Sequence, residues 1–258
     1  MLSGLMLLLI LGVSGKLKKI AIKSITRIAF AGLLLGLHWI LFYASIKYSN
    51  ISVGVVCFSL VSFFTALFAP LINGKKLSVP ELLLSGLTLC GIALIFGLDA
   101  TFRTGIILGV ISAMLAALYT ISNERLTKSF NSQTITLYTM LGGGVGLTII
   151  MPVYLHVFPV ATIVPSLPDF GYLLLLSLVC TDLMYLMTTE AIKTIPAFTV
   201  NLTFSLEPLY SIILAIILYH ENKVLSAGFY CGLALIILSV VLQMFRVFAQ
   251  HKRLGKVV

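Results

Sequence analysis

Long apolar runs recur along the whole sequence, and they restrict what the chain can fold into more than any other feature. Each run has about twenty residues, the length that a helix needs to cross a hydrocarbon layer about 30 Å thick. Hydrophobic residues make up 60% of the chain and charged residues only 10%, whereas a soluble domain is roughly half apolar and a quarter charged. The sequence therefore predicts a helical membrane protein with little chain left for a soluble domain.

The apolar runs between polar interruptions predict nine spans, and hence an all-α, polytopic membrane helix bundle. The expected spans are Met1 to Ser14, Arg27 to Ile46, Val53 to Ile72, Glu81 to Gly97, Thr104 to Ser122, Thr134 to Leu155, Asp169 to Thr189, Ala197 to Leu218 and Ser226 to Val247. Pairs of glycines at helical spacing, such as Gly32 with Gly36 and Gly105 with Gly109, are expected to let helices approach closely.

Basic residues divide unequally between the two sides that these spans define. Lys47, Arg103 and Lys223 fall on one side. The other side carries fourteen of the 17 Lys and Arg, namely Lys16, Lys18, Lys19, Lys23, Arg27, Lys75, Lys76, Arg125, Lys128, Lys193, Arg246, Lys252, Arg253 and Lys256. Positive loops are retained in the cytoplasm, so the chain is expected to lie in the plasma (inner) membrane with a cytoplasmic C-terminus. This distribution also argues against a nucleic-acid partner, which requires basic residues gathered on one soluble face.

The charge asymmetry gives a direct prediction of topology. A reporter that is active only in the cytoplasm should be active when fused after Lys256, because the more basic side is retained inside. The same reporter inserted after Lys47 should be inactive, which provides the internal control. Labelling of a cysteine at position 256 by an impermeant reagent added outside intact cells would contradict the assignment.

The sequence also repeats itself at a constant offset of 146 residues. Three patches coincide at this offset: Ile46-Lys47 with Ile192-Lys193, Phe58-Ser59-Leu60 with Phe204-Ser205-Leu206, and Gly86-Leu87 with Gly232-Leu233. A shared offset indicates a duplication. We therefore expect a first half-repeat at residues 1–98, a second at residues 104–247, and a cytoplasmic tail at residues 248–258.

Under this offset, the span that opens the second half has no counterpart, because its partner would begin about forty residues before Met1. The run from Met1 to Ser14 is also too short to cross a membrane at about 1.5 Å per residue. We therefore expect a parent of ten helices whose first helix is missing here. Two five-helix halves enter the membrane in opposite directions, which is the inverted repeat of many secondary transporters.

The stretch from Ala197 to Leu242, AFTVNLTFSLEPLYSIILAIILYHENKVLSAGFYCGLALIILSVVL, resembles the closing segment of EamA-type transporters in the drug/metabolite transporter superfamily. In that family an apolar helix with a central Pro ends in a Gly-Glu or similar pair; here the pair is His220-Glu221, so only Glu221 matches. The stretch HWILFYASIKYSNISVG, from His38 to Gly54, resembles the corresponding region of the first half. The resemblance implies a ten-helix carrier with both termini cytoplasmic, which moves metabolites, amino acids or drugs by alternating access.

Glu207 is a carboxylate near the centre of its expected span, where a charge is costly unless it is paired, solvated or neutralised. Thr203 and Tyr210 lie about one turn on either side and share its helix face. Pro208 follows directly and is expected to break the helix, because it lacks an N–H and clashes with the preceding turn. We interpret Glu207 as a substrate-binding or proton-coupling residue; the alternative is a carboxylate that only bonds neighbouring helices.

Asp182 is the second intramembrane carboxylate, and Tyr185 and Thr189 follow it at i+3 and i+7 on one helix face. It is a candidate for proton coupling, and a structural hydrogen-bond acceptor is the alternative. His38, Trp39 and Tyr43 are candidates for substrate binding, since aromatic walls with a few polar tips suit organic ligands. Further binding candidates are Tyr185, Tyr119, Asn201 and Ser205. Ordinary packing between helices is the alternative for each of them.

No cofactor, metal site or catalytic residue is expected. The four cysteines stand singly in apolar runs, without the close pairing of a zinc site, and the sequence has no paired-carboxylate or phosphate-loop motif. The expected partners are a small-molecule substrate and membrane lipids, with the chain acting as a monomer or homodimer. Two alternatives to a carrier stay open: an inactive or regulatory truncated carrier, and a membrane-embedded lipid-modifying enzyme.

Overall fold

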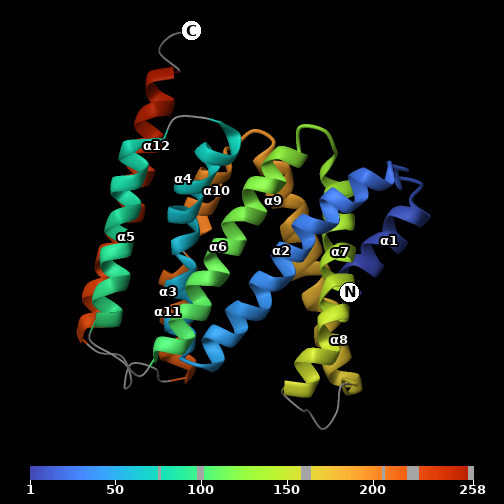
Figure 1. The fold of residues 1–258 in the computed structure, drawn as a ribbon, viewed down its shortest axis with the longest axis horizontal. Helices are drawn as coiled ribbons and strands as arrows, with labels where there is room; N and C mark the ends of the chain where they lie inside the picture. Colours follow the sequence, from blue (N-terminus) through green and yellow to red (C-terminus); the bar gives the residue numbers. More distant parts are fainter. Residues whose placement is uncertain (75–76, 98–101, 158–163, 205–206, 220–226, 255–258) are drawn as a thin grey trace. The chain divides into compact units, whose positions relative to one another are not determined.

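The computed structural model describes residues 1–74, 77–97, 102–157, 164–204, 207–219 and 227–254, and these are almost entirely helical (Figure 1). The helices are α1 (Leu2–Val13), α2 (Ile22–Lys47), α3 (Ile51–Phe58), α4 (Leu60–Asn73), α5 (Val79–Gly97), α6 (Arg103–Leu126), α7 (Ser132–Val157), α8 (Leu167–Leu175), η2 (Leu176–Leu183), α9 (Met184–Ile192), α10 (Ala197–Phe204), α11 (Glu207–Tyr219) and α12 (Ala227–Leu254).

The all-helical fold confirms the fold class that the apolar runs predicted, and a described helix lies at each of the nine expected positions. Six of the described helical stretches are long and apolar enough to cross a membrane, the longest having 26 residues. Helix α1 and the stretch Val79–Gly91 are apolar but shorter. The number of crossings stays a prediction.

Three local features show how helices start, join and change pitch. Asn50 caps α3 by accepting a hydrogen bond from the N–H of Val53 at 2.8 Å, the usual role of Asn before a helix. Ser59 separates α3 from α4 with near-helical angles, φ −57° and ψ −21°. From Leu176 to Leu183 the chain forms a π-helix, η2, which the sequence pattern did not indicate. Such wide turns are rare and often occur at functional sites.

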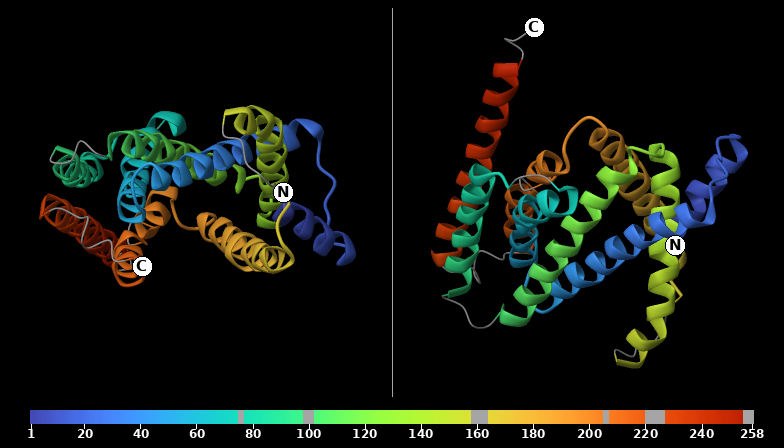
Figure 2. Two further views of the ribbon diagram at one scale, coloured as in Figure 1. Left: turned by 90° about the horizontal axis from the view of Figure 1, so that it is seen from below. Right: turned by 45° about the horizontal axis from the view of Figure 1, so that its top comes forward.

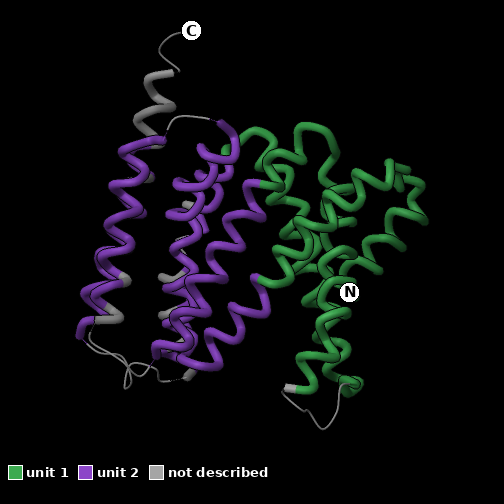
Figure 3. The backbone as a smooth tube through the Cα atoms, viewed as in Figure 1, with its two compact units in different colours: residues 1–37, 122–196 green, residues 38–121, 197–258 purple. Residues whose placement is uncertain are grey.

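The chain divides into two compact units (Figure 3). Unit 1 comprises residues 1–37 and 122–196, and unit 2 comprises residues 38–121 and 197–258. Each unit contains helices from both halves of the sequence, so the units do not coincide with the predicted half-repeats. The half-repeat boundaries are a feature of sequence and stay a prediction.

Within unit 1, glycines allow α2 and α7 to pack with their backbones almost in contact. A Cβ added at Gly32 would lie 2.8 Å from the N of Gly143 and would also meet the carbonyl oxygen of Thr139. Gly142 faces Ala29 in the same way, and Gly36 faces Leu147. These contacts confirm that the glycines serve close packing. In these contacts the residue numbers rise together along both helices, so α2 and α7 run parallel and begin at the same end of unit 1.

Gly32→Ala should destabilise the protein, because the added methyl group meets backbone atoms that cannot rotate away. Overpacking of this kind costs about 1–3 kcal/mol, and we expect a lower thermal unfolding midpoint in detergent. Gly12→Ala is the matched control, since a Cβ at Gly12 meets nothing within 4 Å. Equal unfolding midpoints for the two variants would show that the α2–α7 contact tolerates a side chain.

Within unit 2, α5 and α12 lie side by side over most of their length, as the views of Figures 1 and 2 agree. A Cβ added at Gly91 would lie 2.6 Å from the carbonyl oxygen of Gly232, and Thr88 donates a hydrogen bond to Ser239 at 3.0 Å. Near the other end of the pair, Arg246 reaches Glu81 at 3.5 Å. In these three contacts the residue number rises along α12 as it falls along α5, so the two helices are antiparallel.

The helix contacts of unit 2 are reciprocal under the offset of 146 residues. Helix α3 begins at Ile51 and α10 at Ala197, a difference of 146. Helix α3 packs against α11, and α10 packs against α4. If α3 corresponds to α10 and α4 to α11, each of these contacts is the image of the other. A two-fold relation between equivalent elements produces this exchange.

Candidate functional site

His38 is buried in unit 2 at the centre of a polar contact between α2 and α6. The residue is 4% exposed, and its Nδ1 lies 2.8 Å from the hydroxyl oxygen and 3.1 Å from the carbonyl oxygen of Ser112. The Ser112 hydroxyl also lies 2.9 Å from the carbonyl oxygen of His38. Ser112 thus fixes the ring orientation, and it is a residue that the sequence pattern did not single out.

Three aromatic side chains surround the imidazole of His38, and a fourth extends the group. Its ring centroid lies 5.4 Å from both Trp39 and Phe58 and 6.0 Å from Phe42. Trp39 in turn stacks on Tyr43 at 5.6 Å with an interplanar angle of 23°. We call these five residues the His38 cluster. It combines an apolar wall with one imidazole and one phenol, the combination expected for binding an organic molecule.

The exposure of the His38 cluster increases along α2 from His38 to Tyr43. His38 is 4% exposed, whereas Tyr43 is 58% exposed. The three aromatic residues that the sequence singled out on α2 therefore do lie together. Phe58, which also faces His38, comes from α3, and no local sequence signal connects it to His38.

Asn201 and Tyr119 are also buried in unit 2, with 1% and 5% of their surfaces exposed. Asn201 donates from Nδ2 to the hydroxyl of Thr65 at 2.7 Å and so joins α10 to α4. The hydroxyl of Thr65 in turn donates a hydrogen bond to the carbonyl oxygen of Val61 at 2.7 Å. A fully buried amide–hydroxyl pair in an apolar helix bundle fixes the register of two helices, and the bond is worth on the order of 1 kcal/mol.

Glu207 lies at the N-terminal edge of the described part of α11 and is half-buried. It forms no hydrogen bond or ion pair with the part of the chain that the structure describes. Tyr210, one turn further, is 57% exposed. The expected helix break at Pro208 adjoins residues 205–206, and Ser205 itself lies outside the described residues, as does Glu221.

Asp182 lies in unit 1 within the π-helical stretch η2 and is 4% exposed. Its Oδ1 accepts a hydrogen bond from the hydroxyl of Ser3 on α1. Its Oδ2 is buried and has no hydrogen-bond partner among the described residues. Tyr185 and Thr189 are buried too, at 6% and 0% exposed. A carboxyl group with one free buried oxygen can take up a proton or a ligand at that oxygen, since leaving it unpaired is costly.

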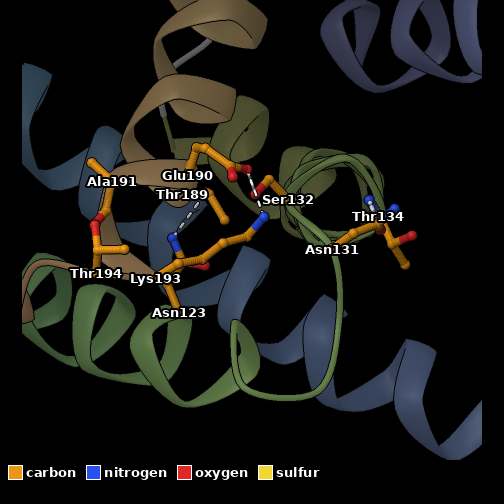
Figure 4. A network of polar contacts seen from close by, with 9 residues as sticks. All are labelled: Asn123, Asn131, Ser132, Thr134, Thr189, Glu190, Ala191, Lys193 and Thr194. Carbon is orange, nitrogen blue, oxygen red and sulfur yellow. Dashed lines mark hydrogen bonds and ion pairs between the residues drawn. The ribbon is translucent and has the colours of Figure 1, made fainter.

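A polar network closes the end of unit 1 where α6 ends, α7 begins and α9 ends (Figure 4). Asn123 donates to the hydroxyl of Thr189 at 3.1 Å and joins α6 to α9. Glu190 accepts from Ser132 at 2.5 Å and from Lys193 at 2.6 Å, which joins α9 to the start of α7. The sequence singled out Thr189 alone, since contacts across 58 and 66 positions leave no local signature.

The model of the EamA-like transporter family matches residues 1–97 and 103–245, which is most of the chain. The chain belongs to the EamA-like transporter family. It is therefore a multi-pass membrane protein from a family of small-molecule transporters, not of enzymes. No curated protein sequence matches it.

The fold has a counterpart among solved structures. One, titled "Crystal structure of protein", is similar with a TM-score of 0.63 and 13% sequence identity. The similarity covers 93% of this chain and 83% of the other. At this identity the likeness concerns the fold alone. Within the described part of the chain, no group of three or more His, Cys, Asp or Glu side chains is placed to hold a metal ion.

Proposed function

We propose that the chain is a secondary transporter that carries a small organic molecule across the inner or plasma membrane by alternating access. The observation that best supports this mechanism is the reciprocal packing of unit 2, in which α3 meets α11 and α4 meets α10. Equivalent helices from inverted halves can exchange roles when one side of a carrier opens and the other closes. The antiparallel course of α5 and α12 agrees with the inversion, because an odd number of spans per half reverses the direction of each equivalent helix.

The proposed substrate-binding residues belong to both halves of the sequence. We assign this role to His38, Trp39, Tyr43, Tyr119, Tyr185, Asn201, Ser205 and Glu207. The His38 cluster supports it most directly, because it offers ring faces beside one imidazole that Ser112 orients. This chemistry favours a flat or amphipathic organic molecule over a strongly hydrated ion.

The two intramembrane carboxylates supply the proposed coupling to protons. Asp182 has a buried oxygen without a partner among the described residues, and Glu207 is half-buried at the N-terminal edge of the described part of α11. A carboxyl group in such a position is stable when it is protonated or when it contacts a cationic group, and it is costly when it is charged and alone. Alternation between those states would link substrate movement to proton movement.

Reconstitution tests this proposal. The purified chain in proteoliposomes, screened against a panel of labelled amino acids, metabolites and aromatic drugs, should show saturable counterflow of at least one compound class. The same compound should accumulate when a proton gradient is imposed. Protein-free liposomes are the control. If counterflow is saturable but does not respond to the gradient, the chain is a carrier without proton coupling. If no compound in the panel shows counterflow, an inactive or regulatory role is favoured.

A further inference from the structure

The connection between α1 and α2, together with the first turns of α2, carries a dense group of basic side chains that form no ion pair with the described residues. These are Lys16, Lys18, Lys19, Lys23 and Arg27, and all five are exposed. The ion pairs formed by the described residues, Lys193 with Glu190 and Arg246 with Glu81, include none of them. The first acidic residue in the sequence is Glu81, so nothing nearby along the chain neutralises this segment. We call residues 16–27 the basic segment.

Apolar side chains alternate with the cations in the basic segment and are exposed as well. Leu17 is 43% exposed and Ile22 is 78% exposed. Residues Lys16 to Ala21 are not helical, and α2 starts directly after them at Ile22. A segment that presents Lys side chains beside exposed Leu and Ile at the end of a membrane-spanning helix fits the boundary between lipid headgroups and acyl chains.

The charge of unit 1 is concentrated at the end where the basic segment lies. Helices α2 and α7 begin at this end, and α6 finishes there with the exposed residues Arg125 and Lys128. The acidic residues at this end are Glu124 and Glu190, and Glu190 is occupied by Lys193 and Ser132. At the opposite end, α8 begins near Asp169, and the sequence holds no Lys or Arg between Lys128 and Lys193. Positive charge in unit 1 is therefore concentrated at the end where α2 and α7 begin.

We propose that the basic segment is a binding surface for anionic phospholipid, in which the lysines contact headgroup phosphates and Leu17 and Ile22 enter the acyl boundary. Orientation in the membrane needs the positive charges but does not need exposed apolar side chains between them. The combination of both features on this connection and the adjoining start of α2 favours lipid over a soluble anion. The bound lipid would hold the α1–α2 connection against the membrane surface.

The test is a lipid titration of the purified full chain in a nonionic detergent, followed by the thermal unfolding midpoint. Phosphatidylglycerol should raise the midpoint, whereas phosphatidylcholine and inorganic phosphate should not. Each surface Lys contributes about 1 kcal/mol, which is about a fivefold change in affinity. The triple variant K16Q/K18Q/K19Q should therefore need on the order of 100-fold more phosphatidylglycerol.

The charge-preserving variant K16R/K18R/K19R is the matched control and should respond to phosphatidylglycerol as the wild type does. In the wild type, rising salt should weaken the response, because exposed charges are screened; this second measurement does not depend on the folding of any variant. An unchanged phosphatidylglycerol response in the Gln variant, or a salt-independent response in the wild type, would overturn the proposal. A shift produced equally by inorganic phosphate would identify a soluble anion as the ligand instead.

Discussion

Glu207→Gln should insert and fold normally but transport at a strongly reduced rate that no longer depends on pH. Gln keeps the shape of the side chain and removes both the charge and the titration. Glu207 is half-buried and unpaired among the described residues, so folding should tolerate the loss of its charge. A charge-assisted interaction with substrate or proton is worth about 1.5–3 kcal/mol, which corresponds to roughly a 10- to 150-fold loss in affinity.

The matched control for Glu207 is Glu124→Gln, which removes the same charge near the end of α6 instead of in the expected middle of a span. This variant should keep the wild-type rate and pH profile. Initial rates of uptake into proteoliposomes from pH 5 to pH 8 provide the measurement. If Glu207→Gln matches the wild type in rate and pH profile, Glu207 is a packing residue, and Asp182 becomes the main candidate for coupling.

The helices could be predicted from sequence because the bilayer imposes a simple rule on composition. Every stretch that crosses the hydrocarbon must be apolar for about twenty residues and must satisfy its backbone internally. The expected span from Thr134 to Leu155 therefore corresponds closely to α7, Ser132–Val157. The offset of 146 likewise links Ile51 and Ala197, where α3 and α10 begin. Family membership, inferred from the Ala197 to Leu242 stretch, is confirmed.

The π-helix from Leu176 to Leu183 could not be predicted, since its composition is that of any apolar span. A wider turn shifts the hydrogen-bond ladder by one residue, and only tertiary packing selects it. The sequence spacing of Asp182, Tyr185 and Thr189 nevertheless indicated a common face, and all three are buried.

The partners of the candidate site residues were also beyond sequence reasoning. His38 could be singled out because an imidazole is rare in an apolar run, but Ser112 is an ordinary residue 74 positions away. Thr65 meets Asn201 across 136 positions, and Ser3 meets Asp182 across 179. Small hydroxyl residues are common in membrane helices, so their identity carries no signal until the fold brings them together.

Asp182→Asn separates the two interpretations of the buried carboxyl group, because Asn keeps an acceptor for Ser3 but cannot take up a proton. If Asp182 couples transport to protons, this variant should lose accumulation driven by a proton gradient while it keeps counterflow of the same substrate. Its thermal unfolding midpoint should stay near that of the wild type, since the bond from Ser3 to the side-chain oxygen is retained.

Asp182→Ala provides the structural comparison, because it leaves the hydroxyl of Ser3 without its acceptor in an apolar environment. An unsatisfied buried group costs about 1–3 kcal/mol, so the unfolding midpoint should fall in this variant but not in Asp182→Asn. The decisive measurement is the ratio of gradient-driven uptake to counterflow in proteoliposomes. If Asp182→Asn preserves that ratio while Asp182→Ala is unstable, Asp182 is a structural acceptor that holds α1 against η2, and the coupling proton must bind elsewhere.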